Sequence, residues 1–233
     1  MQSTNKTIPL LTIGNTIMDL EFKVSDDVLD SLSIDKGSMT LIDQQKKDAV
    51  LQSLNATPHL CCGGSVANSL YIANTLGCKG HHIGVVGHDD IGQQTIADYN
   101  KNGIGHSFND CQLDGDSGCC IVLITPDGER TMLTYLGVSS DYGSFEFMKP
   151  LIAQSNQLFI EGYLVANEAC YTMILEQLIP FAKESQTKLI LTLSDAGLVS
   201  FFKSQFQSIL ATGFDLIFCN RSEAQALSDA STI

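Results

Sequence analysis

Short apolar runs alternate with helix-length segments along the second half of this chain, and this alternation restricts the fold more than any other feature. The strand-like runs are residues 158–163, 188–193 and 215–219, and the helical segments are residues 167–185, 196–212 and 221–228. Strands that alternate with helices of this length form βαβ units, whose parallel sheet is covered by helices on both faces. We therefore predict an α/β fold built on a doubly wound, mainly parallel sheet.

The first half of the chain follows the same order with two interruptions. Residues 8–13 form a buried strand, and apolar residues recur at helical spacing over residues 66–76. Residues 20–43 instead mix alternating apolar positions with an acidic patch. Residues 118–136 have the pattern of a hairpin around Pro126-Asp127-Gly128, with glycine where a positive φ is needed. We assign both segments to a small β appendage beside the main sheet.

Charge and hydropathy exclude several classes of partner. The formal net charge is −13, so the surface field repels phosphate backbones and anionic lipids, and we expect neither a nucleic acid nor a membrane partner. No stretch approaches the roughly 18 apolar residues of a membrane span, and the N-terminus lacks a secretory h-region. The eight cysteines include no CxxC pair. That pattern favours reduced thiols in a cytoplasmic protein.

Two adjacent glycines precede the helix predicted from residue 66. Gly63 and Gly64 remove two side chains at the turn into this helix, so the backbone could lie against a flat ligand rich in hydroxyl groups. Asn68 would add a hydrogen-bond donor and an acceptor on the same side. A tight turn followed by a surface asparagine explains the same residues, and composition alone does not exclude it.

A second polar group follows the first predicted strand, in the segment GNTIMD. Asn15 and Asp19 would lie at the carboxyl end of that strand, which is where ligands bind in open α/β sheets. A carboxylate accepts hydrogen bonds from two hydroxyl groups, and an amide both donates and accepts. The pair therefore suits vicinal hydroxyls, although turn-forming residues would give the same pattern.

Taken in order, four segments resemble the ribokinase/pfkB family of carbohydrate and nucleoside kinases, and most closely its adenosine-kinase-like subgroup. The segments are GNTIMD, CCGGSVANSLYIANTLG, GDSGCCIVLITPDGERTMLTYLG and FCNRSEAQAL. The resemblance implies a Rossmann-like α/β domain with a small β-sheet lid, its lid segments being about 20–43 and 118–136. It also implies transfer of the γ-phosphoryl group of ATP, with Mg²⁺, to a hydroxymethyl group of a sugar or nucleoside, such as adenosine or a ribose-like substrate.

The same resemblance assigns roles to individual residues. Asp19 matches the aspartate that holds sugar hydroxyls, and the other matches to sugar contacts are Asn15, Gly63, Gly64 and Asn68. Arg130, in the predicted hairpin, matches an arginine that can lean over the reacting phosphates. Asn220 and Glu223 match an NxxE motif linked to nucleotide and magnesium binding, with Glu223 reaching the metal through water.

One departure from the family pattern is large. The family has a glycine-rich loop at a helix start, which ends in the aspartate that acts as catalytic base, whereas no glycine follows Gly213 in this chain. We therefore expect one ribokinase-like domain over residues 1–233 that is incomplete at its C-terminus and inactive alone. The alternatives are a non-catalytic paralogue that binds a sugar or nucleoside, and an unrelated doubly wound protein. We also expect that copies could form a homodimer through the lid or an exposed sheet edge.

Overall fold

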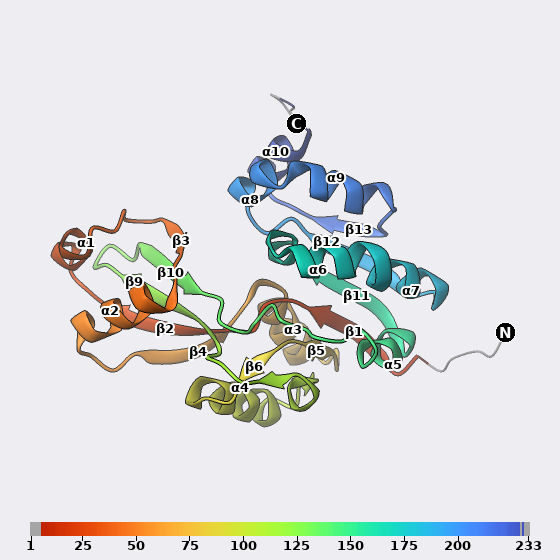
Figure 1. Ribbon diagram of the computed structural model, residues 1–233, viewed down its shortest axis with the longest axis horizontal. Helices are drawn as coiled ribbons and strands as arrows, with labels where there is room; N and C mark the ends of the chain where they lie inside the picture. Colours follow the sequence, from red (N-terminus) through yellow and green to blue (C-terminus); the bar gives the residue numbers. More distant parts are fainter. Residues whose placement is uncertain (1–5, 229, 231–233) are drawn as a thin grey trace.

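The computed structural model describes residues 6–228 and residue 230, and it contains two main sheets that lie side by side (Figure 1). The larger sheet has six strands in the order β13-β12-β11-β1-β5-β7, and every neighbouring pair is parallel. These strands are β1 (Ile8–Ile13), β5 (His81–Ile83), β7 (Gly105–His106), β11 (Ser155–Glu161), β12 (Lys188–Thr192) and β13 (Leu216–Phe218). The predicted α/β fold with a mainly parallel sheet is confirmed.

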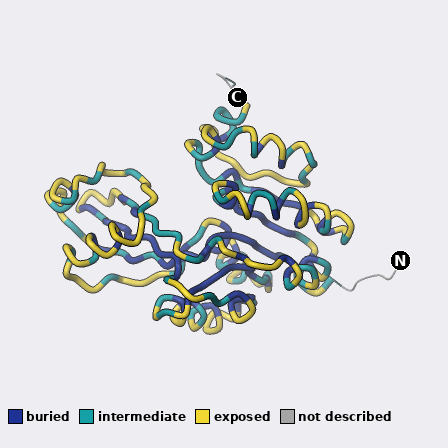
Figure 2. The backbone as a smooth tube through the Cα atoms, in the orientation of Figure 1, coloured by how far each residue is buried: buried dark blue, intermediate teal, exposed yellow. Residues whose placement is uncertain are grey.

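Helices cover both faces of the parallel sheet. On one face, α3 (Ser65–Thr75) packs against β1, β5 and β11, and α4 (Asp90–Lys101) lies near the β7 edge. The helices that share the main hydrophobic core on the other face are α5 (Met148–Ala153), α6 (Glu168–Met173), α7 (Ile179–Glu184), α8 (Ala196–Phe201) and α9 (Lys203–Ala211). The last helix, α10 (Arg221–Ser228), packs against α8 and α9. Figure 2 shows that burial is concentrated in the central strands, whereas β13 is half-exposed at the sheet edge.

The second sheet has five strands in the order β3-β10-β9-β2-β4. They are β2 (Ile17–Lys23), β3 (Met39–Leu41), β4 (His59–Gly63), β9 (Gly118–Ile124) and β10 (Arg130–Tyr135). Four of these strands come from the expected lid segments 20–43 and 118–136 or begin just before them. The turn between β9 and β10 contains Gly128 with φ +86, as the hairpin pattern requires.

Two helices and one strand near the second sheet were not predicted. Helix α1 (Asp26–Leu32) occupies the acidic part of the 20–43 segment, because Asp26 and Asp27 lie in its first turn, where negative charge is favourable. Helix α2 (Gln44–Leu54) begins at Asp43, whose side chain accepts a hydrogen bond from the Lys46 N–H. Both helices pack on one face of the second sheet. Strand β4 pairs with β2 at the edge of this sheet.

Two predicted helices differ in detail from the observed ones. The helix expected over residues 167–185 continues through Pro180, because a π-helical turn (Ile174–Leu178) lies directly before α7. Such a wide turn fits a proline, which has no N–H to donate to the preceding turn. The helix expected over residues 196–212 is divided into α8 and α9 at Phe202.

Four short segments connect the second sheet to the rest of the chain, and Asn15, Gly63 and Gly64 lie in them. They are residues 14–16, 63–64, 114–117 and 136–138. The remaining short elements are β6 (Val86–Gly87), β8 (Gln112–Leu113) and 3₁₀ turns at Phe108–Asp110 and Gly162–Ala166. In the described part of the chain no helix is long and apolar enough to span a bilayer. None of the eight cysteines, all of which are described, forms a disulfide.

Candidate functional site

The carboxyl edge of the parallel sheet brings together polar residues that are far apart in sequence. Asn15 follows β1, Glu161 ends β11, Asp195 follows β12 and Asn220 follows β13. Because carboxyl ends of parallel strands meet at one edge, these side chains border the same region. Burial, followed by the nearby charges of Asp195, Glu161 and Glu223, raises the pKa of Tyr163 to about 12. Tyr163 therefore lies among these carboxylates.

Asn15 and Glu161 form the centre of this edge. The Asn15 backbone N–H and side-chain amide donate to Glu161 Oε1 over 3.2 and 3.1 Å. The other carboxylate oxygen, Oε2, accepts from the Val66 N–H at the start of α3 over 3.4 Å. Ser139 donates to Asn15 Oδ1 over 3.3 Å. Asn15, predicted as a sugar contact, is therefore buried and uses its polar atoms within the protein in this structure.

Glu161 is a site residue that the sequence analysis missed. It is fully buried, and burial raises its pKa to about 7, although the N–H groups of Asn15 and Val66 oppose the shift. A Cβ atom on Gly14 would lie 2.5 Å from Glu161 Oε2, so only glycine leaves room for this carboxylate. A single acidic residue ending the apolar run LFIE was the available signal. Glu161 therefore fixes the end of β1 relative to the start of α3.

Asp19 lies in a different place from the one predicted. It is not at the carboxyl end of the first strand but within β2, where it pairs with Cys61 of β4 and Cys120 of β9. The chain changes sheets within residues 14–16, so the apolar run after Gly14 belongs to the second sheet. Asp19 points from the face of the second sheet that is opposite α1 and α2. We call this face the Asp19 face, and it also carries Glu21, Cys120, Val122 and Arg130.

The Asp19 carboxylate is largely enclosed, with its side chain 23% exposed. Burial raises its pKa to about 6; the Arg130 guanidinium lowers the pKa and the Glu21 carboxylate raises it. A Cβ atom on Gly63 would lie 2.6 Å from Asp19 Oδ1, closer than any real contact of this kind. Gly63 therefore leaves the space that this carboxylate occupies.

Gly64 has a separate reason to be glycine. Its φ is +103, and a Cβ atom would lie 2.8 Å from the Asn15 carbonyl oxygen. It is the residue that precedes α3, and its carbonyl accepts from the Asn68 N–H over 2.9 Å. The two positions thus require glycine for different reasons. Gly63 leaves room for the Asp19 side chain, and Gly64 adopts a positive φ where the backbone lies close to the Asn15 carbonyl oxygen.

Asn68 lies exposed on α3 and lines a cavity of about 690 Å³ between β4, α3 and α4. Cys61, the strand neighbour of Asp19, lines the same cavity, as do Tyr71 and Asp98, which are hydrogen-bonded to each other. A cavity of this size falls in the range for small-molecule sites. Three other residues of this lining, Met18, Leu60 and Cys62, face away from Asp19. Asn68 thus borders a hollow at the β4 edge, without a hydrogen bond to Asp19 among the described atoms.

Arg130 begins β10 and extends across the Asp19 face. Its Nη2 atom lies 3.2 Å from Glu21 Oε1 and 3.8 Å from Asp19 Oδ2, and its side chain is 49% exposed. The structure therefore places Arg130 on the same face as Asp19, with the two side chains within ion-pair distance. Glu21 was not predicted; its place two residues after Asp19 on a strand was the only signal.

Asn220 and Glu223 form a reciprocal cap at the start of α10. The Glu223 N–H donates to Asn220 Oδ1 over 2.9 Å, and the Asn220 N–H and amide donate to the Glu223 carboxylate over 3.1 and 2.8 Å. This is the capping-box arrangement, with asparagine in the place of serine or threonine. It gives the NxxE pattern a local structural cause, independent of any ligand.

The described side chains form no ready-made metal site. Within residues 6–228 and 230 no group of three or more histidine, cysteine or acidic side chains could hold a metal ion. Glu223 is buried, and its carboxylate already accepts two hydrogen bonds from Asn220. Its remaining lone pairs fit contact through water, the mode that Mg²⁺ bound to phosphates commonly uses.

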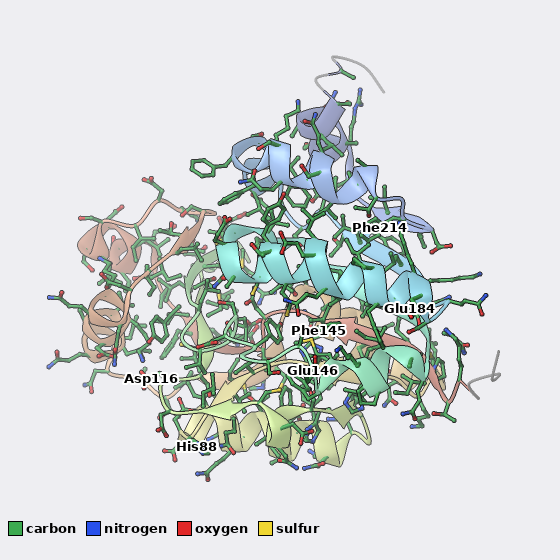
Figure 3. All side chains as sticks on the ribbon, turned by 45° about the vertical axis from the view of Figure 1, so that its right-hand side comes forward. His88, Asp116, Phe145, Glu146, Glu184 and Phe214 are labelled. Carbon is green, nitrogen blue, oxygen red and sulfur yellow. The ribbon has the colours of Figure 1, made fainter. Side chains whose placement is uncertain are left out.

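A larger cavity, of about 1050 Å³, lies away from these residues. It is lined by the loop after the second sheet and by α6, and Figure 3 shows Phe145 and Glu146 beneath the helix that contains α6 and α7. None of the predicted site residues lines it.

Comparison with known proteins gives consistent matches. A family model described as pfkB family carbohydrate kinase matches residues 28–233. Guanosine-inosine kinase of Escherichia coli K12 is 25% identical over 240 residues, which cover 99% of this chain and 55% of that protein. Adenosine kinase of Saccharomyces cerevisiae is 26% identical, covering 96% of this chain and 67% of that protein.

The fold matches solved structures as well. The crystal structure of adenosine kinase from Sinorhizobium meliloti has 30% identity and a TM-score of 0.85, over 96% of this chain and 68% of that one. A probable sugar kinase from Rhizobium etli has 27% identity and a TM-score of 0.86, over 97% of this chain and 68% of that one. The chain thus spans 55% of the bacterial guanosine-inosine kinase and about two thirds of these solved kinases.

Proposed function

The chain belongs to the pfkB family of carbohydrate kinases, and from that premise we propose that it carries the substrate site and lid of an ATP-dependent nucleoside kinase. The reaction is transfer of the γ-phosphoryl group of ATP to the hydroxymethyl group of the sugar. The observation that carries the proposal is the fit of Asp19 against Gly63, which sets one enclosed carboxylate on the Asp19 face.

In this proposal Asp19 accepts hydrogen bonds from two neighbouring sugar hydroxyls. A charged acceptor contributes about 1.5–3 kcal/mol for each such bond. The sugar lies against the backbone turn at Gly63 and Gly64, where Gly63 also leaves room for the Asp19 carboxylate. Asn68 and Asn15 supply amide contacts. Ser139 donates to Asn15 Oδ1, so a sugar hydroxyl that donates to this oxygen must displace the Ser139 hydroxyl or share the oxygen with it.

A nucleoside fits the Asp19 face better than a free sugar does. Around Asp19 this face carries partly buried apolar residues that would contact a flat, largely apolar base. They are Ile124, Met132 and Leu136, which pack on the buried residues Ile17, Cys120 and Val122. The names of the relatives, guanosine-inosine kinase and adenosine kinase, support the same substrate class.

Arg130 would act on the phosphates. Its long, half-exposed side chain begins at the hairpin and could turn from the carboxylates toward the phosphoryl group in transfer. Magnesium, when bound with ATP, neutralises charge on the phosphates, and Glu223 and Asn220 lie at the sheet edge where they could contact its water ligands. The five-stranded second sheet serves as the lid that excludes water.

The 233-residue chain is proposed to bind substrate but not to turn it over at an ordinary rate. No glycine follows Gly213, so the chain has no glycine-rich helix start to hold the transferring phosphoryl group. Loss of a general base and of phosphate-holding N–H groups each lowers a rate by about 10²-fold or more.

The test is a binding panel combined with a transfer assay on the purified chain. Calorimetry would compare adenosine, guanosine, inosine and ribose, each with its 2′- or 3′-deoxy analogue where one exists. Mass spectrometry would look for phosphorylated product after incubation with ATP and magnesium. We expect binding of at least one ribonucleoside, with weaker binding of its deoxy analogues. Failure to bind any member of the panel would contradict the proposed substrate site.

A further inference from the structure

Two polar residues on the Asp19 face, Glu21 and His59, have no role in the proposed reaction. Glu21 Oε1 lies 3.2 Å from Arg130 Nη2, and its other oxygen, Oε2, lies 3.2 Å from His59 Nδ1. The side chain of Glu21 is 26% exposed, whereas that of His59 is 76% exposed. Glu21 is thus the better enclosed of these two residues, and its carboxylate contacts both Arg130 and His59.

The strands fix the order of these side chains. Asp19 and Glu21 are two residues apart on β2, so both point from the same face. Glu21 pairs with His59 of β4 and with Val122 of β9. This row lies two residues farther along β2 than the row formed by Cys61, Asp19 and Cys120. Arg130, at the start of β10, comes from still farther along, since its partner Ile124 pairs with Lys23. Glu21 therefore lies between Asp19 and the end of the face from which the Arg130 side chain extends.

The two distances differ in kind. At 3.2 Å, Arg130 and Glu21 are hydrogen-bonded, whereas at 3.8 Å Arg130 and Asp19 interact only as charges. If Glu21 had no charge, Asp19 would be the nearest carboxylate to Arg130. A guanidinium hydrogen-bonded to Asp19 would occupy the oxygen atoms that the sugar hydroxyls need.

We propose that Glu21 is a positioning residue that keeps the Arg130 guanidinium on the Asp19 face but off the Asp19 carboxylate. This inference rests on the proposed function, because it assigns Asp19 to sugar hydroxyls and Arg130 to phosphates. Glu21 keeps the Asp19 carboxylate free to accept hydrogen bonds from the substrate. It also holds the Arg130 guanidinium where a phosphate group of the phosphoryl donor can bind it. His59 steadies the outer oxygen of Glu21 at the rim of the sheet.

The first arm of the test needs no ligand. The pKa of Asp19 would be measured by carboxyl-carbon NMR in the 233-residue chain and in Glu21→Gln, each with and without Arg130→Ala. Loss of the Glu21 charge lowers the Asp19 pKa in either background. Release of Arg130 onto Asp19 adds a further drop only when Arg130 is present. We expect the drop with Arg130 to exceed the drop without it by about one unit, and equal drops would overturn the inference.

The second arm measures ribonucleoside affinity by calorimetry at pH 7.5. We expect Glu21→Gln to weaken binding at least threefold, and Arg130→Ala in the same chain to restore it. A merely structural role for Glu21 would not produce this rescue, so weakening without rescue contradicts the inference. Glu129→Gln removes one exposed charge next to Arg130 in sequence and serves as the matched control, with unchanged affinity expected.

The two arms separate the inference from the proposed function. Absence of ribonucleoside binding by the unaltered chain would reject the proposed substrate site. The NMR comparison would still decide whether Glu21 controls the position of Arg130.

Discussion

Asp19 Oδ1 lies 2.6 Å from the position that a Cβ atom would take on Gly63. These residues come from neighbouring antiparallel strands, β2 and β4, and the glycine ends its strand where the chain returns to the parallel sheet. The Asp19 carboxylate therefore requires glycine at position 63. It is enclosed because β4, which has no side chain at Gly63, can approach it closely. The candidate site depends on this pair.

Gly63→Ala should displace the Asp19 carboxylate and weaken ribonucleoside binding by roughly tenfold or more, since a contact that close forces one partner to move. Binding would be measured by calorimetry on the purified chain. Gly197→Ala is the matched control, because Gly197 is exposed in α8 and its added methyl group meets only the Asp195 side chain, at 3.1 Å. Equal affinities in both variants would show that the space beside Asp19 is not used for binding.

Ribonucleoside affinity should rise with pH around the pKa of Asp19. Burial raises that pKa to about 6, and only the ionised carboxylate offers both of its oxygen atoms purely as acceptors. Affinity at pH 5 should therefore be about tenfold lower than at pH 7.5, since most Asp19 is protonated at the lower pH. Asp19→Asn should bind weakly with little pH dependence. An affinity independent of pH in the unaltered chain would remove Asp19 from the binding site.

Glu161 should make the free energy of unfolding depend on pH in a defined direction. Its folded pKa is raised from an ordinary 4.5 to about 7, so its stabilising contribution is present below the lower value and lost as pH rises through 7. Buried His82 acts in the opposite direction, because its pKa is lowered to about 3. The comparison must therefore be made between variants.

Urea unfolding at pH 5 and pH 8 isolates the Glu161 term. The unaltered chain should lose on the order of 2–3 kcal/mol more between these pH values than Glu161→Gln, which cannot ionise. Glu168→Gln, an exposed change at the start of α6, should behave like the unaltered chain. Parallel pH profiles for the unaltered chain and Glu161→Gln would contradict the assignment.

Glu223→Ala should destabilise the chain through its helix cap. The substitution removes two hydrogen bonds from Asn220 and leaves the first turn of α10 without its reciprocal partner. Loss of such a cap costs about 1 kcal/mol. Urea unfolding would be compared with that of Glu176→Ala, which alters an exposed acidic residue elsewhere in a helix. Equal free energies of unfolding for the two variants would mean that the Asn220–Glu223 cap does not stabilise the chain.

The parallel sheet could be predicted because its strands are continuous apolar runs separated by helices. The second sheet was harder, for physical reasons. Strand β4 is an edge strand with exposed residues at His59, Leu60 and Cys61, so it lacks a clear apolar pattern. Helix α2 buries only Lys47 and Val50, which leaves little helical periodicity in its sequence.

Some site residues could likewise be predicted from the sequence, and others could not. Gly63, Gly64, Asp19 and Arg130 stand in short motifs, whose close contacts come from adjacent strands. Asp19 was nevertheless assigned to the wrong sheet, because only residues 14–16 separate β1 from β2 and the apolar pattern continues across them. Glu161 contacts Asn15 across 146 positions of sequence, and no local pattern encodes that contact.

The most direct test of the account is a thermodynamic cycle between Asp19 and the sugar hydroxyls. Calorimetry at pH 7.5 would measure adenosine and 2′,3′-dideoxyadenosine against the unaltered chain and Asp19→Asn. We expect the unaltered chain to prefer adenosine by roughly tenfold or more, and Asp19→Asn to lose most of that preference. The same preference for adenosine in both chains, or no binding of any ribonucleoside of the panel to the unaltered chain, would contradict the account.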